Sequence, residues 1–135
     1  MSKNDSINPK HYKHPSGVEC VDIAEHLPFC LGNALKYVWR AGEKGDYVED
    51  LRKAEWYLKR FLKHPVVPPS RFVHEKMIKE DAAHYVRSET SEFKRGAVAL
   101  IVAGRFDLEG LFDLKAVKRA AALVAEEIKK VEARS

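Results

Sequence analysis

The sequence contains only two cysteines, Cys20 and Cys30, and they do not form a CxxC pair. We expect both thiols to be reduced and buried around one helix, as in a cytosolic protein. A metal site that these thiols share with His26 is a weaker alternative, because no second CxxC or HxxxH motif completes a ligand set. No apolar run is long enough to cross a bilayer, and the polar start MSKNDSINPK is not a signal peptide. We therefore expect a soluble cytoplasmic protein without a membrane partner.

The familiar signatures of nucleotide and hydrolase chemistry are also missing. There is no GxxxxGK(S/T) phosphate loop and no GxGxxG sequence after a strand. A GxSxG nucleophile elbow and an HExxH zinc motif are equally absent. If this protein handles nucleotides, it must bind phosphate with a cluster of side chains instead of a glycine-rich loop.

Composition and charge indicate a globular protein. Of the 135 residues, 45% are hydrophobic and 33% are charged, which is enough apolar surface to bury a core. We expect one domain, or one domain with an appended helical region. The net charge of +4 favours anionic partners only slightly and is far below that of a polybasic arm, so nucleic acid is not the expected partner.

Apolar residues recur at helical spacing along most of the chain, and no stretch shows the period-two pattern of a strand. This pattern predicts an all-α fold of about five to six helices with a proline-rich crossover near residues 65–69. We expect a nucleotide-binding region at residues 8–64. A second helical region at residues 70–135 is expected to complete the core or to mediate oligomerisation. The expected helices are 16–27, 32–42, 46–62, 71–86, 91–102 and 114–132, with a loop at 104–110.

Two short motifs predict where helices begin. Ser16 with Glu19 matches a capping box, and Asp46 with Glu49 is a second match. Between them, Gly32 is expected to open a central helix and Gly42 to close it.

The central helix carries the most informative pattern in the sequence. Asn33, Lys36, Tyr37 and Arg40 fall at i, i+3, i+4 and i+7, which places them on one face, while Leu31, Leu35 and Val38 recur on another. Two cations one turn apart repel each other slightly, and an anionic partner is a natural reason for their presence. The simpler alternative is a solvated helix face that happens to be basic.

Phosphate is the anion that these side chains suit best. Lys36, Arg40 and Lys44 together neutralise its charge, and Arg40 can bind two oxygens at once. The helix N-terminus after Gly45 offers backbone N–H groups for the same purpose. Its first turn is acidic, however, so its carboxylates are as well suited to cap the helix or to pair with Arg40 or Lys44. The carboxylates of that turn are Asp46, Glu49 and Asp50.

Aromatic residues and imidazoles near this stretch suit a base or a sugar. His11 and Tyr12 offer a titratable ring and a stacking face, although packing against helix ends explains them as well. Asp50, Lys53 and Tyr57 share a face of the helix after the turn. Trp56 and Tyr57 are more typical of a core or an interface than of a ligand site.

Paired carboxylates on two helices are a weak alternative signal. All-α pyrophosphohydrolases use such pairs to hold Mg²⁺. Glu89 with Glu92 and Glu109 with Asp113 resemble this pattern loosely, and Gly110 interrupts the second pair.

Several motifs together resemble one known family. The segments NPKHY, GVECVD, GNALKYVWRAGEKG and EDLRKAEWYL are similar to a small phage-encoded family of largely unknown function. This family includes a deoxynucleoside monophosphate kinase that lacks a Walker motif. The resemblance covers residues 8–62, under half of the chain, and residues 65–135 carry no motif of this family.

The resemblance implies phosphoryl transfer from a nucleoside triphosphate to a deoxynucleoside monophosphate. It also implies that no cofactor beyond the triphosphate donor is used, that a metal ion is not required, and that copies form a homo-oligomer. A phage protein of this kind would act in the host bacterial cytoplasm. The expected catalytic residues are Lys36, Arg40 and His11, and the expected substrate-binding residues are Tyr12, Asn33, Tyr37, Lys44, Asp50, Lys53 and Tyr57.

Two alternatives to a kinase stay open. A protein with this pattern can bind or sequester nucleotides without turning them over. It can also be an interaction protein whose basic face meets nucleic acid or a host protein.

Overall fold

Helices account for all of the regular structure in residues 14–65, 75–105 and 113–134, the parts of the chain that the computed structural model describes. These ranges contain six helices and no strand, which confirms the predicted all-α fold. The helices are α2 (Cys20–Ala24), α3 (Phe29–Arg40), α4 (Tyr47–Lys63), α5 (Glu75–Ser88), α6 (Glu92–Ala103) and α7 (Leu114–Arg134).

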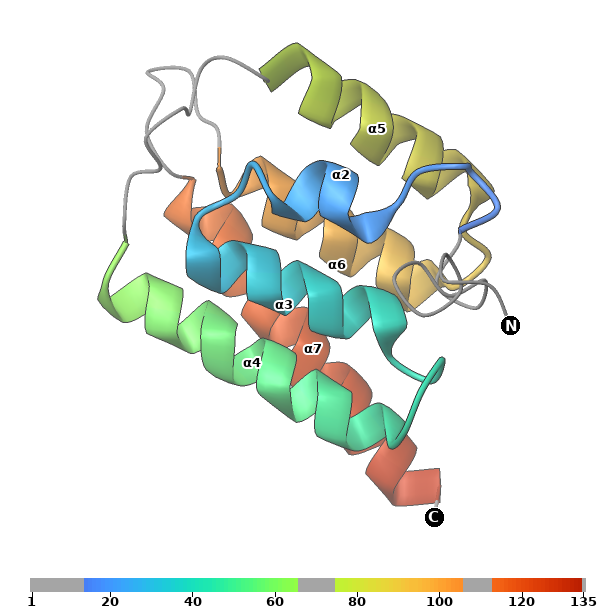
Figure 1. Ribbon diagram of the computed structural model, residues 1–135. Helices are drawn as coiled ribbons and strands as arrows, with labels where there is room; N and C mark the ends of the chain where they lie inside the picture. The colour runs from blue at the N-terminus through green and yellow to red at the C-terminus, as the bar shows by residue number, and fades with distance from the viewer. Residues whose placement is uncertain (1–13, 66–74, 106–112, 135) are drawn as a thin grey trace.

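Four of the helices enclose the core. α3 packs on α4, α4 on α7, α7 on α6 and α6 on α3, so the four contacts close into a ring (Figure 1). α2 lies against α3, and α5 lies against both α2 and α6. α3 therefore has a neighbour on each side, with α2 along one flank and α4 along the other. The candidate site is built on this helix.

The apolar stripes read from the sequence line this core. Leu31, Leu35 and Val38 of α3 are fully buried, as are Leu51 and Leu58 of α4. Residues of α6 and α7 belong to the same buried cluster. Burying apolar side chains stabilises the fold by about 1.5–3 kcal/mol for each large residue.

The first expected helix begins and ends elsewhere than predicted. It starts at Cys20, not at Ser16, and its capping box is formed by Glu19 and Asp22. Gly17 has a φ of +82°, a left-handed conformation that a right-handed helix cannot contain, so the helix cannot extend back over it. The helix also ends at Ala24, before the expected end at Leu27.

The start of the central helix also differs from the prediction, whereas Gly42 closes the helix as expected, directly after the C-cap Ala41. α3 begins at Phe29, directly after its N-cap Pro28, so Gly32 lies inside the helix and does not open it. A proline before the first turn suits this position, because its missing N–H would have no partner there. α3 ends at Arg40, and Gly42 follows in the turn with a φ of +83°.

The start of α4 is confirmed. The side chain of Asp46 accepts a hydrogen bond from the Glu49 N–H at 2.9 Å, as an N-cap does. The remaining observed helices agree with their predicted ranges to within a few residues, at the ends that the structure describes. The proline-rich crossover beyond Pro65 and the loop at 106–112 lie outside the described residues.

Candidate functional site

Three cations from two helices surround one tyrosine ring. The Nζ of Lys36 lies 4.5 Å from the centre of the Tyr37 ring, and the Nζ of Lys53 lies 5.4 Å from it. The Cζ of Arg40 is 5.6 Å away. Tyr57 of α4 stacks on Tyr37 of α3, with ring centres 6.0 Å apart and an angle of 11° between the planes. The α3–α4 packing thus brings Tyr37 against Tyr57, twenty positions away in the sequence.

Two exposed aromatic rings extend this group. Phe29 meets Tyr57 edge to face at 6.2 Å, and Trp56 meets it edge to face at 5.0 Å. Phe29 is 76% exposed and Trp56 is 60% exposed. Of the two roles expected for Trp56, core or interface, its exposure excludes the core. We call the whole group the cation–aromatic cluster: Phe29, Lys36, Tyr37, Arg40, Lys53, Trp56 and Tyr57.

A buried carboxylate holds Arg40. Oδ2 of Asp50 lies 3.7 Å from Nε of Arg40, and the Asp50 side chain is only 5% exposed. Neither of these two atoms makes a hydrogen bond. The Arg40 side chain is 30% exposed, so the Asp50 contact fixes one side of it while part of it still meets solvent. The carboxylates of the acidic turn were expected either to cap the helix or to pair with a cation, and Asp50 pairs with Arg40.

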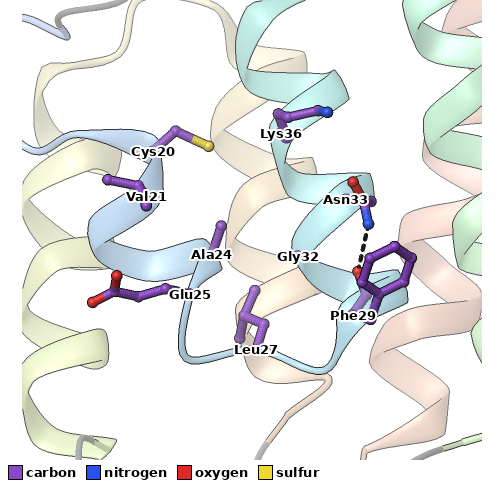
Figure 2. A pocket seen from close by; sticks show the side chains of 9 residues that line it. All are labelled: Cys20, Val21, Ala24, Glu25, Leu27, Phe29, Gly32, Asn33 and Lys36. Atoms are coloured by element: carbon purple, nitrogen blue, oxygen red, sulfur yellow. Dashed lines mark hydrogen bonds between the residues drawn. The ribbon is translucent and has the colours of Figure 1, made fainter. Parts of the chain in front are cut away.

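The polar face of α3 is divided between two neighbours. Tyr37 and Arg40 face α4, whereas Asn33 and Lys36 line an open pocket of about 590 Å³ between α2 and α3 (Figure 2). Nδ2 of Asn33 donates to the Phe29 carbonyl at 3.0 Å. The residues that line this pocket are Cys20, Val21, Ala24, Glu25, Leu27, Phe29, Gly32, Asn33 and Lys36.

The structure places another expected site residue, Lys44, outside this cluster. Lys44 is exposed in the turn between α3 and α4. Glu49 pairs with Lys53 at 3.3 Å on the exposed side of α4. His11 and Tyr12 lie outside the described residues. Phe29 could not be included from the sequence, because an aromatic residue next to a proline carries no sign of whether it is exposed.

A second polar group lies behind α3, and sequence reasoning missed it. Nε2 of His14 lies 3.0 Å from Oε1 of Glu89, and the His14 ring stacks on Tyr85 at 4.2 Å. Nζ of Lys94 donates to the Trp39 carbonyl at 2.9 Å, near the C-terminus of α3. Burial lowers the pKa of Lys94, although nearby carboxylates oppose the shift. This group joins the segment before α2 to the α5–α6 connection.

The His14–Glu89 contact should make stability depend on pH. Burial opposes the charge on Glu89, but the Ser91 N–H at 2.7 Å and His14 hold its pKa below the ordinary 4.5. The folded state therefore binds this proton more weakly than the unfolded state. The resulting stabilisation is present above pH 4.5 and is lost as the pH falls through the lowered pKa.

We expect Glu89→Gln to remove this part of the acid sensitivity. The difference in free energy of unfolding between the wild type and this variant should shrink as the pH falls below 4.5. Urea denaturation over a pH series measures the difference. Glu126→Gln is the control, because Glu126 is exposed and pairs with Lys130 one turn away. An unchanged difference at low pH would contradict the assignment.

The expected cysteine arrangement needs one correction. Cys20 lies on α2 and Cys30 on α3, so the two thiols do not surround one helix. Both are free and only partly buried. Burial raises the pKa of the Cys20 thiol to about 12.

Metal ligands do not gather in the part of the chain that the structure covers. There, no group of three or more His, Cys, Asp or Glu side chains is arranged to hold an ion. Glu89, half of one weak carboxylate pair, contacts His14 instead, and Glu109 of the other pair lies outside the described residues. Over the same ranges, no helix has both the length and the apolar character of a membrane span.

Fold and site together define a small all-helical protein with a basic, aromatic surface beside an open pocket. Residues 7–59 match a family described as a protein of unknown function, DUF3310. The chain is 39% identical over 72 residues to the gene 1.7 protein of Enterobacteria phage T3, covering 46% of this chain and 44% of that protein. It is 36% identical over 66 residues to nucleotide kinase gp1.7 of Escherichia phage T7, covering 42% and 34%.

These comparisons confirm the resemblance expected over residues 8–62. The chain spans less than half of the length of the curated relatives it matches. No solved structure matches it significantly. The matched region contains α2, α3 and most of α4, so it includes both the cation–aromatic cluster and the pocket.

Proposed function

We propose that this protein binds nucleotides at the cation–aromatic cluster and transfers a phosphoryl group from a nucleoside triphosphate to a deoxynucleoside monophosphate. The observation that carries the proposal is the convergence of Lys36, Arg40 and Lys53 around the Tyr37 ring. Cations from two helices meet there, next to exposed aromatic rings. Nucleotides combine the two properties that such a surface recognises, a planar base and a multiply charged phosphate.

Phosphoryl transfer is compatible with a site made of side chains. The reaction needs reactants to be positioned and charge on the transferred group to be neutralised, more than it needs covalent chemistry from the protein. In this proposal Arg40 binds phosphate oxygens while Asp50 fixes its orientation. Lys36 and Lys53 add charge, and Tyr37 and Tyr57 form the aromatic floor. His11 and Tyr12 would join from the segment before α2. The similarity of this chain to the nucleotide kinase gp1.7 of phage T7 supports the proposed function.

Homo-oligomer formation is part of the proposal. Phe29 and Trp56 expose large apolar rings, and rings of this size are frequent at contacts between protein copies. Sedimentation or gel filtration, with and without nucleotide, measures the association.

A product assay tests the function. The protein is incubated with ATP or dTTP and with each deoxynucleoside monophosphate, with and without EDTA. The deoxynucleoside diphosphate formed from the monophosphate is quantified. We expect diphosphate from at least one monophosphate, including when EDTA is present. Tight binding without product would instead support a protein that sequesters nucleotides. Retention of DNA that falls steeply with salt, without nucleotide binding, would overturn the proposal in favour of nucleic-acid binding.

A further inference from the structure

The pocket between α2 and α3 has the volume of a small-molecule site. Its volume of about 590 Å³ lies within the range of about 300–1,000 Å³ that is typical of such sites. The two helices approach closely at Gly32, where a Cβ atom would lie 2.9 Å from the Ala24 carbonyl oxygen. The absence of a side chain there leaves helix backbone as part of the pocket floor. Val21 and Phe29, which are both exposed, stand at its edges.

The polar side chains that line this pocket are those of Glu25, Asn33 and Lys36, beside the Cys20 thiol. Asn33 uses one amide N–H to bind the Phe29 carbonyl, and its side chain has a second N–H and a carbonyl oxygen. A donor beside an acceptor is the pattern that pairs with the edge of a nucleobase. The walls from Val21, Ala24 and Leu27 are apolar, as the faces of a base and a sugar require.

Charged side chains make the two sides of the pocket electrostatically different. Figure 2 shows Lys36 and Glu25 on opposite sides of it. A phosphate is attracted by the Lys36 ammonium and repelled by the Glu25 carboxylate, which also faces His26 at 3.2 Å. An anionic ligand would therefore place its charge at the α3 side and its uncharged part towards α2.

The pocket and the cation–aromatic cluster are continuous. Lys36 and Phe29 belong to both: Lys36 lies against the Tyr37 ring, and Phe29 contacts Tyr57. One molecule can thus occupy the pocket with its planar part and reach the cluster with its phosphate.

We infer that this pocket is the nucleoside subsite, which holds the base and sugar of the monophosphate while its phosphate lies at Lys36 beside the cluster. The inference rests on the proposed function and assigns the two halves of the nucleotide to two different surfaces. The cluster then supplies charge, and the pocket supplies the preference for a nucleoside over other phosphates.

Filling the pocket without changing its charge tests this division. Ala24→Leu adds a larger apolar side chain to the pocket wall, and the control Ala99→Leu makes the same change on the exposed side of α6. We expect Ala24→Leu to weaken binding of deoxynucleoside monophosphates by at least about tenfold, the loss of one well-packed contact region. Binding of inorganic tripolyphosphate, which has no base, should stay unchanged. Calorimetry measures both affinities.

A second variant keeps the test decisive if Ala24→Leu fails to fold. Val21→Trp closes the pocket edge from a residue that is 54% exposed, so it does not disturb the core. Normal monophosphate binding by a folded Ala24→Leu or Val21→Trp protein would overturn the inference and leave the proposed function intact. Equal loss of monophosphate and tripolyphosphate would overturn it as well. If the wild type binds neither probe, the proposed function itself fails.

Discussion

Replacing Arg40 with alanine is expected to weaken nucleotide binding by about 10- to 100-fold, since a hydrogen bond to a charged group contributes about 1.5–3 kcal/mol. Arg40 is the guanidinium of the cluster and sits 5.6 Å from the Tyr37 ring. Arg40→Lys should recover only part of the loss, because an ammonium cannot bind two phosphate oxygens in parallel. Calorimetric titration with a nucleoside triphosphate measures the affinities.

The control for Arg40 must separate binding from folding. Arg40→Ala leaves the Asp50 carboxylate buried without its ionic partner, which destabilises the fold. The double variant Arg40→Ala with Asp50→Asn removes that charge and should bind as weakly as the single variant while it is more stable. Arg52→Ala tests whether the loss of any cation on α4 would weaken binding, because Arg52 is exposed and pairs with Glu132 of α7. Wild-type affinity in Arg40→Ala, or an equal loss in Arg52→Ala, would contradict the site.

Replacing Phe61 with alanine is expected to cost about 3–5 kcal/mol of the free energy of unfolding. Phe61 is only 1% exposed and is among the largest fully buried side chains of the described residues. Its removal leaves a cavity that the packed helices around it cannot fill completely. Urea denaturation followed by circular dichroism measures the loss.

Trp56→Ala is the matched comparison on the same helix. Trp56 is 60% exposed and meets Tyr57 edge to face, so its removal should cost only about 0.5–1 kcal/mol. In the proposed site, however, this variant should bind nucleotide more weakly because a stacking face is lost. Similar destabilisation by both substitutions would mean that α4 does not bury the face seen in the structure.

Local signals predicted much of the helical framework. The spacing of Leu51, Leu58 and Phe61 predicted the buried face of α4, and Asp46 predicted its first turn. Such signals succeed because helical periodicity and capping depend on residues within one or two turns. The first helix was misplaced because Ser16 and Glu19 imitate a capping box, whereas Gly17 between them adopts a left-handed conformation.

The candidate site could be predicted only in part. Placing Lys36, Tyr37 and Arg40 on one helix needed nothing beyond their spacing. The family resemblance had already named Lys53 and Tyr57, but their contact with Tyr37 depends on how α4 packs across α3. The exposure of Phe29 and Trp56 could not be predicted from the sequence either, because an aromatic residue has the same apolar character in a core and on a surface.

The sequence by itself determined the all-helical class and most of the helices, the basic face of α3 and the resemblance to a family of unknown function, because each depends on residues close together along the chain. Only the tertiary structure decided that this face is shared between a pocket with α2 and a cluster with α4. It alone also brought His14 to Glu89 across 75 positions. The physical reason is that packing acts between surfaces, and which surfaces meet is fixed by how all the helices bury their apolar faces at once.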